Sequence, residues 1–308
     1  MRSLLGFLGR HARWALPAGV FVGIAAPELA AVLRPLLTPA VIGTLSAALL
    51  RLDWVRLAQA ARRPAVAGWI AAWQLVASPL LVWLGAGLAG LPPDLRLVLV
   101  LQAAAPPIGS AAVFAMILGL DGIFAVIGTV ATTLLLPLTL TPLVAVVLPE
   151  TGLHVDIAAF FARVTTLVAA PFVIAWALRR AIGPARLARN DDLLAGANVV
   201  LLVVFAIAVM DGVTARLAAD PVFIGVLLAA ACVATTLLHL AGFVLFRGAG
   251  VASAYGAALL SGNRNMGLML AITAGTAGPT FSLYVGIAQI PMYFAPLALT
   301  PFVRRSRL

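Results

Sequence analysis

The chain has 308 residues, of which 63% are hydrophobic and 10% are charged, and its formal net charge is +10. Its mean hydropathy is +1.13. Because soluble domains carry about 25% charged residues, this composition excludes a soluble enzyme and a disordered chain. The positive charges are too sparse to form a basic face for nucleic acid, and a single cysteine, Cys232, excludes an intrachain disulfide.

Ten apolar runs follow one another along the chain, each bounded by charged residues or by Pro and Gly. A membrane-spanning helix needs about 20 mostly apolar residues, so each run predicts a span. The predicted spans are 14–32, 35–50, 64–88, 95–118, 122–148, 157–178, 193–210, 222–246, 251–274 and 281–303. The basic N-terminus has no clear cleavage site, and we expect it to be retained with the first span. The sequence therefore predicts an all-α integral membrane protein of ten transmembrane helices.

The arginines are distributed unevenly between the two sides that alternating spans define. Arg34, Arg96 and Arg216 fall on one side. The other side collects Arg2, Arg10, Arg13, Arg51, Arg56, Arg62, Arg63, Arg179, Arg180, Arg186, Arg189, Arg247, Arg304, Arg305 and Arg307. Because basic loops stay in the cytoplasm, this pattern predicts a multi-pass protein of the inner (cell) membrane with both termini cytoplasmic.

Two further arginines lie inside predicted spans. Arg163 is near the outer end of the sixth span, where its long side chain is expected to reach the membrane interface. Arg264 is in the middle of the ninth span, where a charge costs at least about 2.5–3.5 kcal/mol. The guanidinium group of Arg264 must therefore face a polar interior that supplies hydrogen-bonding partners.

The residues around Arg264 predict a break in the ninth span. Ser261, Asn263 and Asn265 compete for backbone hydrogen bonds, and Gly262 relaxes the helix. A break at membrane depth frees N–H and C=O groups, which is tolerated only beside protein or a cavity. Because freed amides favour anions and freed carbonyls favour cations, the break predicts a binding site.

The fourth span contains a corresponding interruption. Pro106 and Pro107 remove two backbone donors, so an unbroken helix cannot continue through them. The fourth and ninth spans hold the same place in two halves of five spans, 1–150 and 151–308. An odd number of spans starts the second half from the opposite side of the membrane. Paired interruptions in such halves are typical of transporters built from inverted repeats.

Four segments carry a resemblance to a known family. Residues 262–268 are similar to its Glu-x-Gly-x-Gln-Asn-x-Gly-Leu signature, and residues 105–121 to its Pro-Gly-Gly…Ser-Asn…Gly-Asp stretch. Residues 129–142 are similar to its Thr…Ser-Thr-Leu…Pro…Leu-Thr-Pro stretch, and Gln74 precedes Pro79 as in its third span. On these segments the chain resembles the bile acid:sodium symporter family, whose wider superfamily includes arsenite and other anion carriers.

The resemblance implies a fold with two units. Spans one, two, six and seven would form a panel from residues 14–50 and 157–210. The other spans would form a core from residues 64–148 and 222–303. In such a fold the broken fourth and ninth helices cross inside the core, and the substrate lies between core and panel.

The resemblance also implies two sodium ions near the crossing, but this chain differs at the ligand positions. The family's acidic ligand falls on Leu260 and an amide falls on Arg264, while other polar ligands fall on Ala111, Ala112 and Ala125. Polar side chains are kept at Gln74, Thr129, Thr132 and Thr133. Because alanine side chains cannot bind sodium and an arginine repels it, we expect these sodium sites to be absent.

Two roles remain open for Arg264. In the first, its guanidinium group replaces the missing ions and holds the crossing together through carbonyls, Thr129, Gln74 and Asn263. In the second, it binds an anionic substrate directly.

Other polar residues are candidates for lining the cavity or for coupling. Ser110 and Gln289 are candidate substrate contacts. Glu28 and His239 are candidates for proton coupling. The alternatives are an interfacial turn at Glu28 and a hydrogen-bonded core histidine at His239.

Taken together, these features predict a secondary transporter of a small organic anion that works by alternating access in the lipid bilayer. The alternative is a non-transporting sensor or scaffold with the same fold. The sequence contains no metal spacing, nucleophile elbow or phosphate loop of an enzyme. We therefore expect no enzymatic activity, no cofactor and no nucleic-acid partner.

Overall fold

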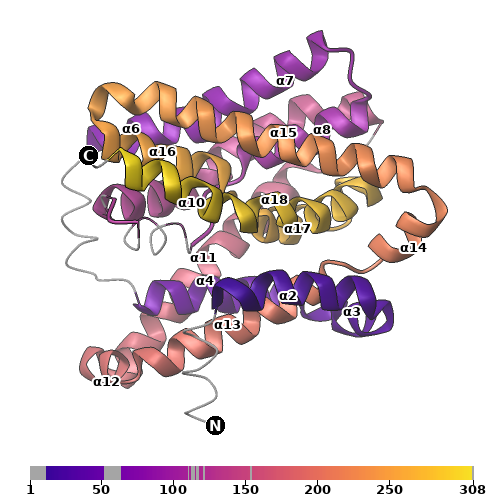
Figure 1. The fold of residues 1–308 in the computed structure, drawn as a ribbon. Helices are drawn as coiled ribbons and strands as arrows, with labels where there is room; N and C mark the ends of the chain where they lie inside the picture. Colours follow the sequence, from indigo (N-terminus) through magenta and orange to yellow (C-terminus); the bar gives the residue numbers. More distant parts are fainter. Residues whose placement is uncertain are drawn as a thin grey trace.

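The computed structural model describes residues 12–51, 64–109, 111, 115, 118–120, 122–152 and 155–306. The candidate residues Ser110 and Ala112 lie outside this part of the chain, as do Arg2, Arg10, Arg56, Arg62, Arg63 and Arg307. The described residues are almost entirely helical (Figure 1). The prediction of an all-α protein is therefore confirmed.

The helices follow the predicted spans closely. In chain order they are α2 (Ala12–Ala25), α3 (Pro27–Leu33), α4 (Leu37–Arg51), α6 (Pro64–Ala71), α7 (Ser78–Leu88), α8 (Pro93–Ala104), α10 (Gly122–Val147), α11 (Ile157–Ile182), α12 (Pro184–Arg189), α13 (Asp191–Ala208), α14 (Val213–Ala219), α15 (Pro221–Phe246), α16 (Val251–Gly262), α17 (Met266–Thr273) and α18 (Gly278–Arg305).

Seven helical segments of the described chain are long and apolar enough to cross a membrane. They are Pro27–Arg51, Pro64–Leu88, Phe124–Thr151, Ile157–Ile182, Asp191–Ala219, Pro221–Ala249 and Gly278–Arg305. Large apolar side chains on their outer faces are exposed, as at Trp176 and Leu237, which is how a helix meets lipid. The protein is thus a multi-pass membrane protein, while the count of ten stays a prediction.

One group of helices packs around α13 and forms the lower layer in Figure 1. Gly19 of α2 lies against Ala206, and Gly23 lies against Met210, so α2 runs parallel to α13 at close range. The last residue of α4, Arg51, forms an ion pair with the first residue of α13, Asp191. Helix α4 therefore runs in the opposite direction, and the chain reverses between α2 and α4.

The second group comprises α6, α7, α8, α10 and α15 to α18, and forms the upper layer in Figure 1. Within this group α15 packs along α16 and α18, and α7 packs along α8. Helix α11 contacts α4 of the first group as well as α10 and α17 of the second. The two groups therefore meet along α4, α11, α17 and α18.

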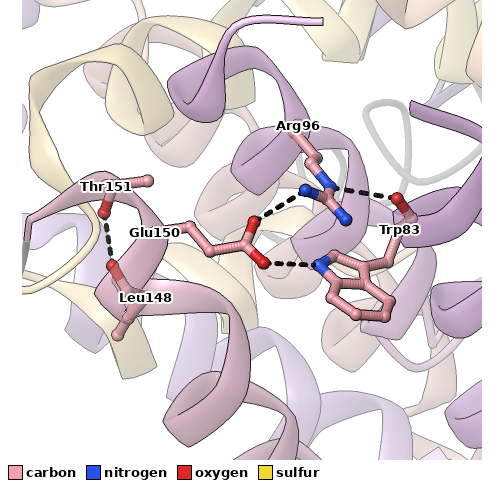
Figure 2. A network of polar contacts seen from close by, with 5 residues as sticks. All are labelled: Trp83, Arg96, Leu148, Glu150 and Thr151. Carbon is pink, nitrogen blue, oxygen red and sulfur yellow. Dashed lines mark hydrogen bonds and ion pairs between the residues drawn. The ribbon is translucent and has the colours of Figure 1, made fainter. Parts of the chain in front are cut away.

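A polar cluster ties α7 and the start of α8 to the turn after α10 in the second group (Figure 2). Arg96 of α8 donates from Nη1 to Oε2 of Glu150 at 2.9 Å and from Nε to the carbonyl oxygen of Trp83 at 3.0 Å. The Trp83 indole N–H donates to Oε1 of the same carboxylate at 3.3 Å. The guanidinium carbon lies 4.6 Å from the Trp83 ring centroid, a cation–π contact. The cluster joins α7, α8 and the turn after α10.

Both predicted interruptions are present as breaks in the helices. Helix α8 stops at Ala104, and Ala105 has an extended backbone with ψ of 142°, because the prolines that follow cannot donate to a helix. In the ninth predicted span α16 ends at Gly262, and the Asn265 side chain caps the start of α17 by accepting from the Leu268 N–H.

A π-helical turn in the third predicted span was not predicted. It covers Ala72–Ala77 and separates α6 from α7. Pro79 follows this turn and has no N–H group to donate to the preceding turn. Such wide turns shift the following residues around the helix and are frequent at functional sites.

Candidate functional site at a helix crossing

The two broken helices meet backbone to backbone. The Ile108 N–H donates to the carbonyl oxygen of Asn263 at 2.9 Å, and the Asn265 N–H donates to that of Pro106 at 2.7 Å. This pair of bonds is an isolated antiparallel bridge inside a helical protein. Backbone groups freed by each break are thereby satisfied by the other, which is what burial at this depth requires.

The Arg264 side chain lies at the centre of this crossing and is 1% exposed. Its Nε donates to the carbonyl oxygen of Ser261 at 2.6 Å, and its Nη1 donates to that of Ala105 at 2.8 Å. Its Nη2 donates to Oγ of Ser78 at 3.1 Å, and Nη1 lies 3.5 Å from the carbonyl oxygen of Gln74. The guanidinium group therefore caps the C-terminal ends of α8 and α16.

The charge of Arg264 is balanced by these dipoles. Among the described residues no carboxylate forms an ion pair with it. A helix C-terminus carries the equivalent of about half a negative charge, and two such ends converge on the guanidinium group. This arrangement explains how a fixed cation is tolerated in the middle of an apolar protein.

A second polar network connects His239 of α15 to the crossing. Its Nδ1 lies 2.7 Å from the carbonyl oxygen of Thr235, and its Nε2 lies 3.1 Å from Nδ2 of Asn263. A carbonyl oxygen only accepts, so Nδ1 carries the hydrogen and Nε2 accepts from the amide. The network continues through Thr235, whose hydroxyl accepts from Gln102, and Gln102 accepts in turn from the hydroxyl of Tyr284.

Two neighbouring cavities lie between the α13 group and the crossing. The first has an empty volume of about 570 Å³ and is lined by Val41, Thr44, Leu45, Ala48, Ile108, Gly109, Asn198, Leu202, Phe205, Arg264, Asn265, Met266, Gly267, Gln289 and Tyr293. The second has an empty volume of about 510 Å³ and is lined by Leu45, Ala48, Leu49, Gly109, Val126, Thr129, Val130, Thr133, Val168, Pro171 and Phe172. Apart from Arg264, the polar residues in both linings are neutral.

Several buried polar atoms at these cavities have no hydrogen-bond partner among the described residues. They are Oγ1 of Thr44 and Oδ1 of Asn198 in the first cavity, and Oγ1 of Thr129 in the second. Oε1 of Gln74 at the crossing is also unpartnered. An unpaired buried polar atom costs about 1–3 kcal/mol, so these positions are suited to meet a polar ligand or water.

The structure brings most of the predicted site residues together. Ser261, Asn263, Arg264, Asn265, Gln74 and His239 meet at the crossing, while Thr129, Thr133 and Gln289 line the cavities. The hydroxyl of Thr132 instead donates to the carbonyl oxygen of Gly128 in its own helix. Glu28 is exposed in the first turn of α3 and lines neither cavity.

Thr44 and Asn198 were missed by the sequence analysis. Each is a polar residue inside a predicted apolar span, which is a signal available in the sequence. The face of the helix on which each lies is set by the packing of α4 against α13, and the sequence pattern does not reveal this packing.

Three of the positions that the resemblance assigns to sodium ligands lie in one apolar cluster. Leu260, Ala111 and Ala125 are each 0% exposed and pack in one cluster with Ile70. A side chain at Gly128 would lie 2.6 Å from Cδ1 of Leu260, so the leucine fills the space tightly. The side chains in this cluster offer no oxygen ligand to a hard cation such as sodium.

A multi-pass bundle with broken helices crossing beside a cavity is typical of membrane transport proteins. The model of the Sodium Bile acid symporter family matches residues 38–217, which is more than half of the chain, and the protein belongs to this family. The match runs from α4 to α14 and does not include Arg264. No curated protein matches the chain.

Proposed function

We propose that the protein is a secondary transporter of a small organic anion that works by alternating access in the inner cell membrane. Family membership and the apolar helices support transport across a membrane. In this proposal ten spans form two inverted repeats, and both termini are cytoplasmic. The group around α13, together with α11, is the panel, and the remaining spans are the core.

The first cavity is the proposed substrate site. It lies where α4 and α13 face the start of α17, and the N-terminus of a helix attracts negative charge. The Thr44 hydroxyl and the Asn198 amide are the polar groups that α4 and α13 supply there. The unpartnered hydroxyl of Thr44 is the observation that carries this proposal, because a hydroxyl can donate to an anion and a buried polar group without a partner is unusual. The unpartnered Oδ1 of Asn198 only accepts, so it is suited to a hydroxyl group of the substrate or to water.

We further propose that transport does not use sodium ions at the positions used by the family. The cation at the crossing is Arg264, which already bonds to the carbonyl groups at the ends of α8 and α16. Half-helix C-termini of this kind are the groups that bind coupling ions in other transporters. Because Arg264 is 1% exposed and each of its three guanidinium nitrogens already donates to the protein, its proposed role is that of a built-in cation beside the first cavity, which it also lines.

The test is transport by the purified protein in liposomes. Labelled taurocholate, benzoate and lactate serve as probes, each in sodium buffer and in choline buffer. We expect uptake of at least one anion at equal rates in both buffers. Uptake that stops in choline would contradict the sodium proposal, and no uptake of any anion would favour the sensor or scaffold alternative.

Matched variants in α4 test the site. Thr44→Val removes a cavity hydroxyl while keeping the shape of the side chain, and it is expected to lower uptake at least about tenfold. Ser46→Ala is the control, because the hydroxyl of Ser46 bonds to its own helix at the carbonyl oxygen of Ile42 and does not line the cavity. Equal loss in both variants would place the substrate elsewhere.

A further inference from the structure

Arg163 of α11 caps the far end of the half-helix α17. Its Nη1 donates to the carbonyl oxygen of Ala274 at 2.7 Å, and its Nη2 donates to that of Ala271 at 2.9 Å. The last carbonyl groups of a helix have no partner within it and attract cations. The guanidinium group, which was expected only to reach the interface, thus bonds α11 to α17.

These bonds lie on the opposite side of the crossing from the cavities. The first cavity touches the start of α17 at Asn265, Met266 and Gly267, and the eight residues of α17 extend about 12 Å from there. The second cavity touches α11 at Val168, Pro171 and Phe172, beyond Arg163 in the chain direction. Arg163 therefore closes the side that the cavities do not reach.

Glycine residues of α17 and α18 also lie close to the α13 group. A side chain at Gly267 would lie 3.0 Å from both Phe205 and Val41, and one at Gly286 would lie 2.8 Å from the carbonyl oxygen of Val209. These approaches are van der Waals contacts, which have no fixed bond direction. The bonds from Arg163 have fixed directions and must break when α11 and α17 separate.

We propose that Arg163 is a latch that holds the transporter closed on the side away from the cavities. The proposal rests on the alternating-access function proposed above. Release of the guanidinium group from Ala271 and Ala274 frees α17 to move away from α11. The latch acts on the half-helix whose other end forms the substrate cavity, so that one short helix joins substrate site and latch.

The test measures two distances between spin labels by pulsed electron paramagnetic resonance in lipid nanodiscs. Both pairs are built in a Cys232→Ala background, and all four positions are exposed. One pair, Phe161→Cys on α11 and Pro279→Cys on α18, lies on the latch side. The other pair, Leu178→Cys and Phe302→Cys, lies near the opposite ends of the same helices.

Arg163→Gln is expected to shift the ratio of closed to open populations at least about tenfold, since two charge-assisted bonds are lost. The latch-side distance should lengthen and the opposite distance should shorten. In Arg163→Lys a single ammonium group replaces the two guanidinium donors. Both distances in this variant should lie between those of the parent and those of Arg163→Gln. Arg216→Gln is the matched control, because Arg216 pairs with Asp220 four residues along the chain and should leave both distances unchanged.

Unchanged distances in Arg163→Gln would overturn the latch, and so would lengthening of the latch-side pair alone, which describes a frayed helix end. If the glutamine variant does not purify as a monodisperse protein, Arg163→Lys decides by the same criteria. If the distances shift in Arg163→Gln but the parent protein transports none of the labelled anions, the latch is upheld and the transport proposal is refuted. Anion transport with unshifted distances would refute the latch alone.

Discussion

At the helix crossing, the positive charge is the guanidinium group of Arg264, and the carbonyl oxygens that bind it belong to the same protein chain. The carbonyl oxygens of Ser261 and Ala105 receive a guanidinium group that cannot dissociate. In the role proposed for Arg264, the crossing is held together equally well at every sodium concentration. If the role of Arg264 is structural, its substitution should make the stability of the protein depend on sodium, whereas the stability of the parent should not.

Arg264→Gln is expected to lower the unfolding free energy by at least about 3 kcal/mol, because the carbonyl groups lose their donors inside the protein. Thermal unfolding in detergent, followed by circular dichroism, measures the change. Sodium should restore part of the lost stability of the variant relative to choline, since the glutamine leaves the carbonyl groups free for an ion. The melting temperature of the parent should be the same in both salts.

Arg34→Gln is the control for this prediction. Arg34 pairs with Asp211, but 65% of its side chain is exposed, so its loss should cost less than about 1 kcal/mol. A parent protein that melts higher in sodium than in choline would contradict the role assigned to Arg264.

Between elements, the contact of α15 with α16 depends on the absence of a side chain at Gly262. A Cβ atom at this position would overlap the ring of His239. The ring itself is held by the carbonyl oxygen of Thr235 and by Asn263. Gly262, which helps to break the ninth span, thus also leaves room for the ring of His239 because it has no side chain.

Gly262→Ala is expected to destabilise the protein by at least about 1–3 kcal/mol, the usual cost of overpacking a core. Gly68→Ala is the matched control, because a Cβ atom there meets no atom within 4 Å, and it should leave the melting temperature unchanged or slightly raised. Adding His239→Ala to Gly262→Ala should recover part of the loss. An unaffected Gly262→Ala variant would show that α15 and α16 separate easily.

The elements show why sequence analysis found the breaks but not the contacts. Pro106 and Gly262 act on their own helices, so the interruptions could be predicted from neighbouring residues. The bonds from Arg264 to Ala105 and Gln74 join residues 159 and 190 positions apart in the chain. Such partners follow from the packing of whole helices.

For the whole molecule, the arginines of the arginine-poor side share one feature. Each arginine on the arginine-poor side forms an ion pair: Arg34 with Asp211, Arg96 with Glu150, and Arg216 with Asp220. Acidic partners weaken the topology signal little, because basic residues dominate it. The arrangement fits the proposed orientation, with these three arginines outside the cell.

Labelling of single cysteines in intact cells tests this orientation. In a Cys232→Ala background, Ala89→Cys should react with a membrane-impermeant maleimide, because it precedes Arg96 in an exposed turn. Ser306→Cys, exposed after the end of α18, should react only after permeabilisation. The reverse labelling pattern would show that the orientation in the membrane is opposite to the one proposed. Labelling of both cysteines in intact cells would indicate an odd number of spans.

The cluster of Trp83, Arg96 and Glu150 also bears on how the molecule moves. It fastens the middle of α7 and the start of α8 to the turn after α10, while Ser78 at the start of α7 and Ala105 after α8 both meet Arg264. Helices α7 and α8 are therefore linked at two levels, at Arg264 and at the Arg96 cluster, and this opposes sliding of one helix along the other. We expect α7 and α8 to move as one rigid unit. A small tilt of this unit at mid-membrane therefore produces a larger displacement where the unit reaches the membrane surface.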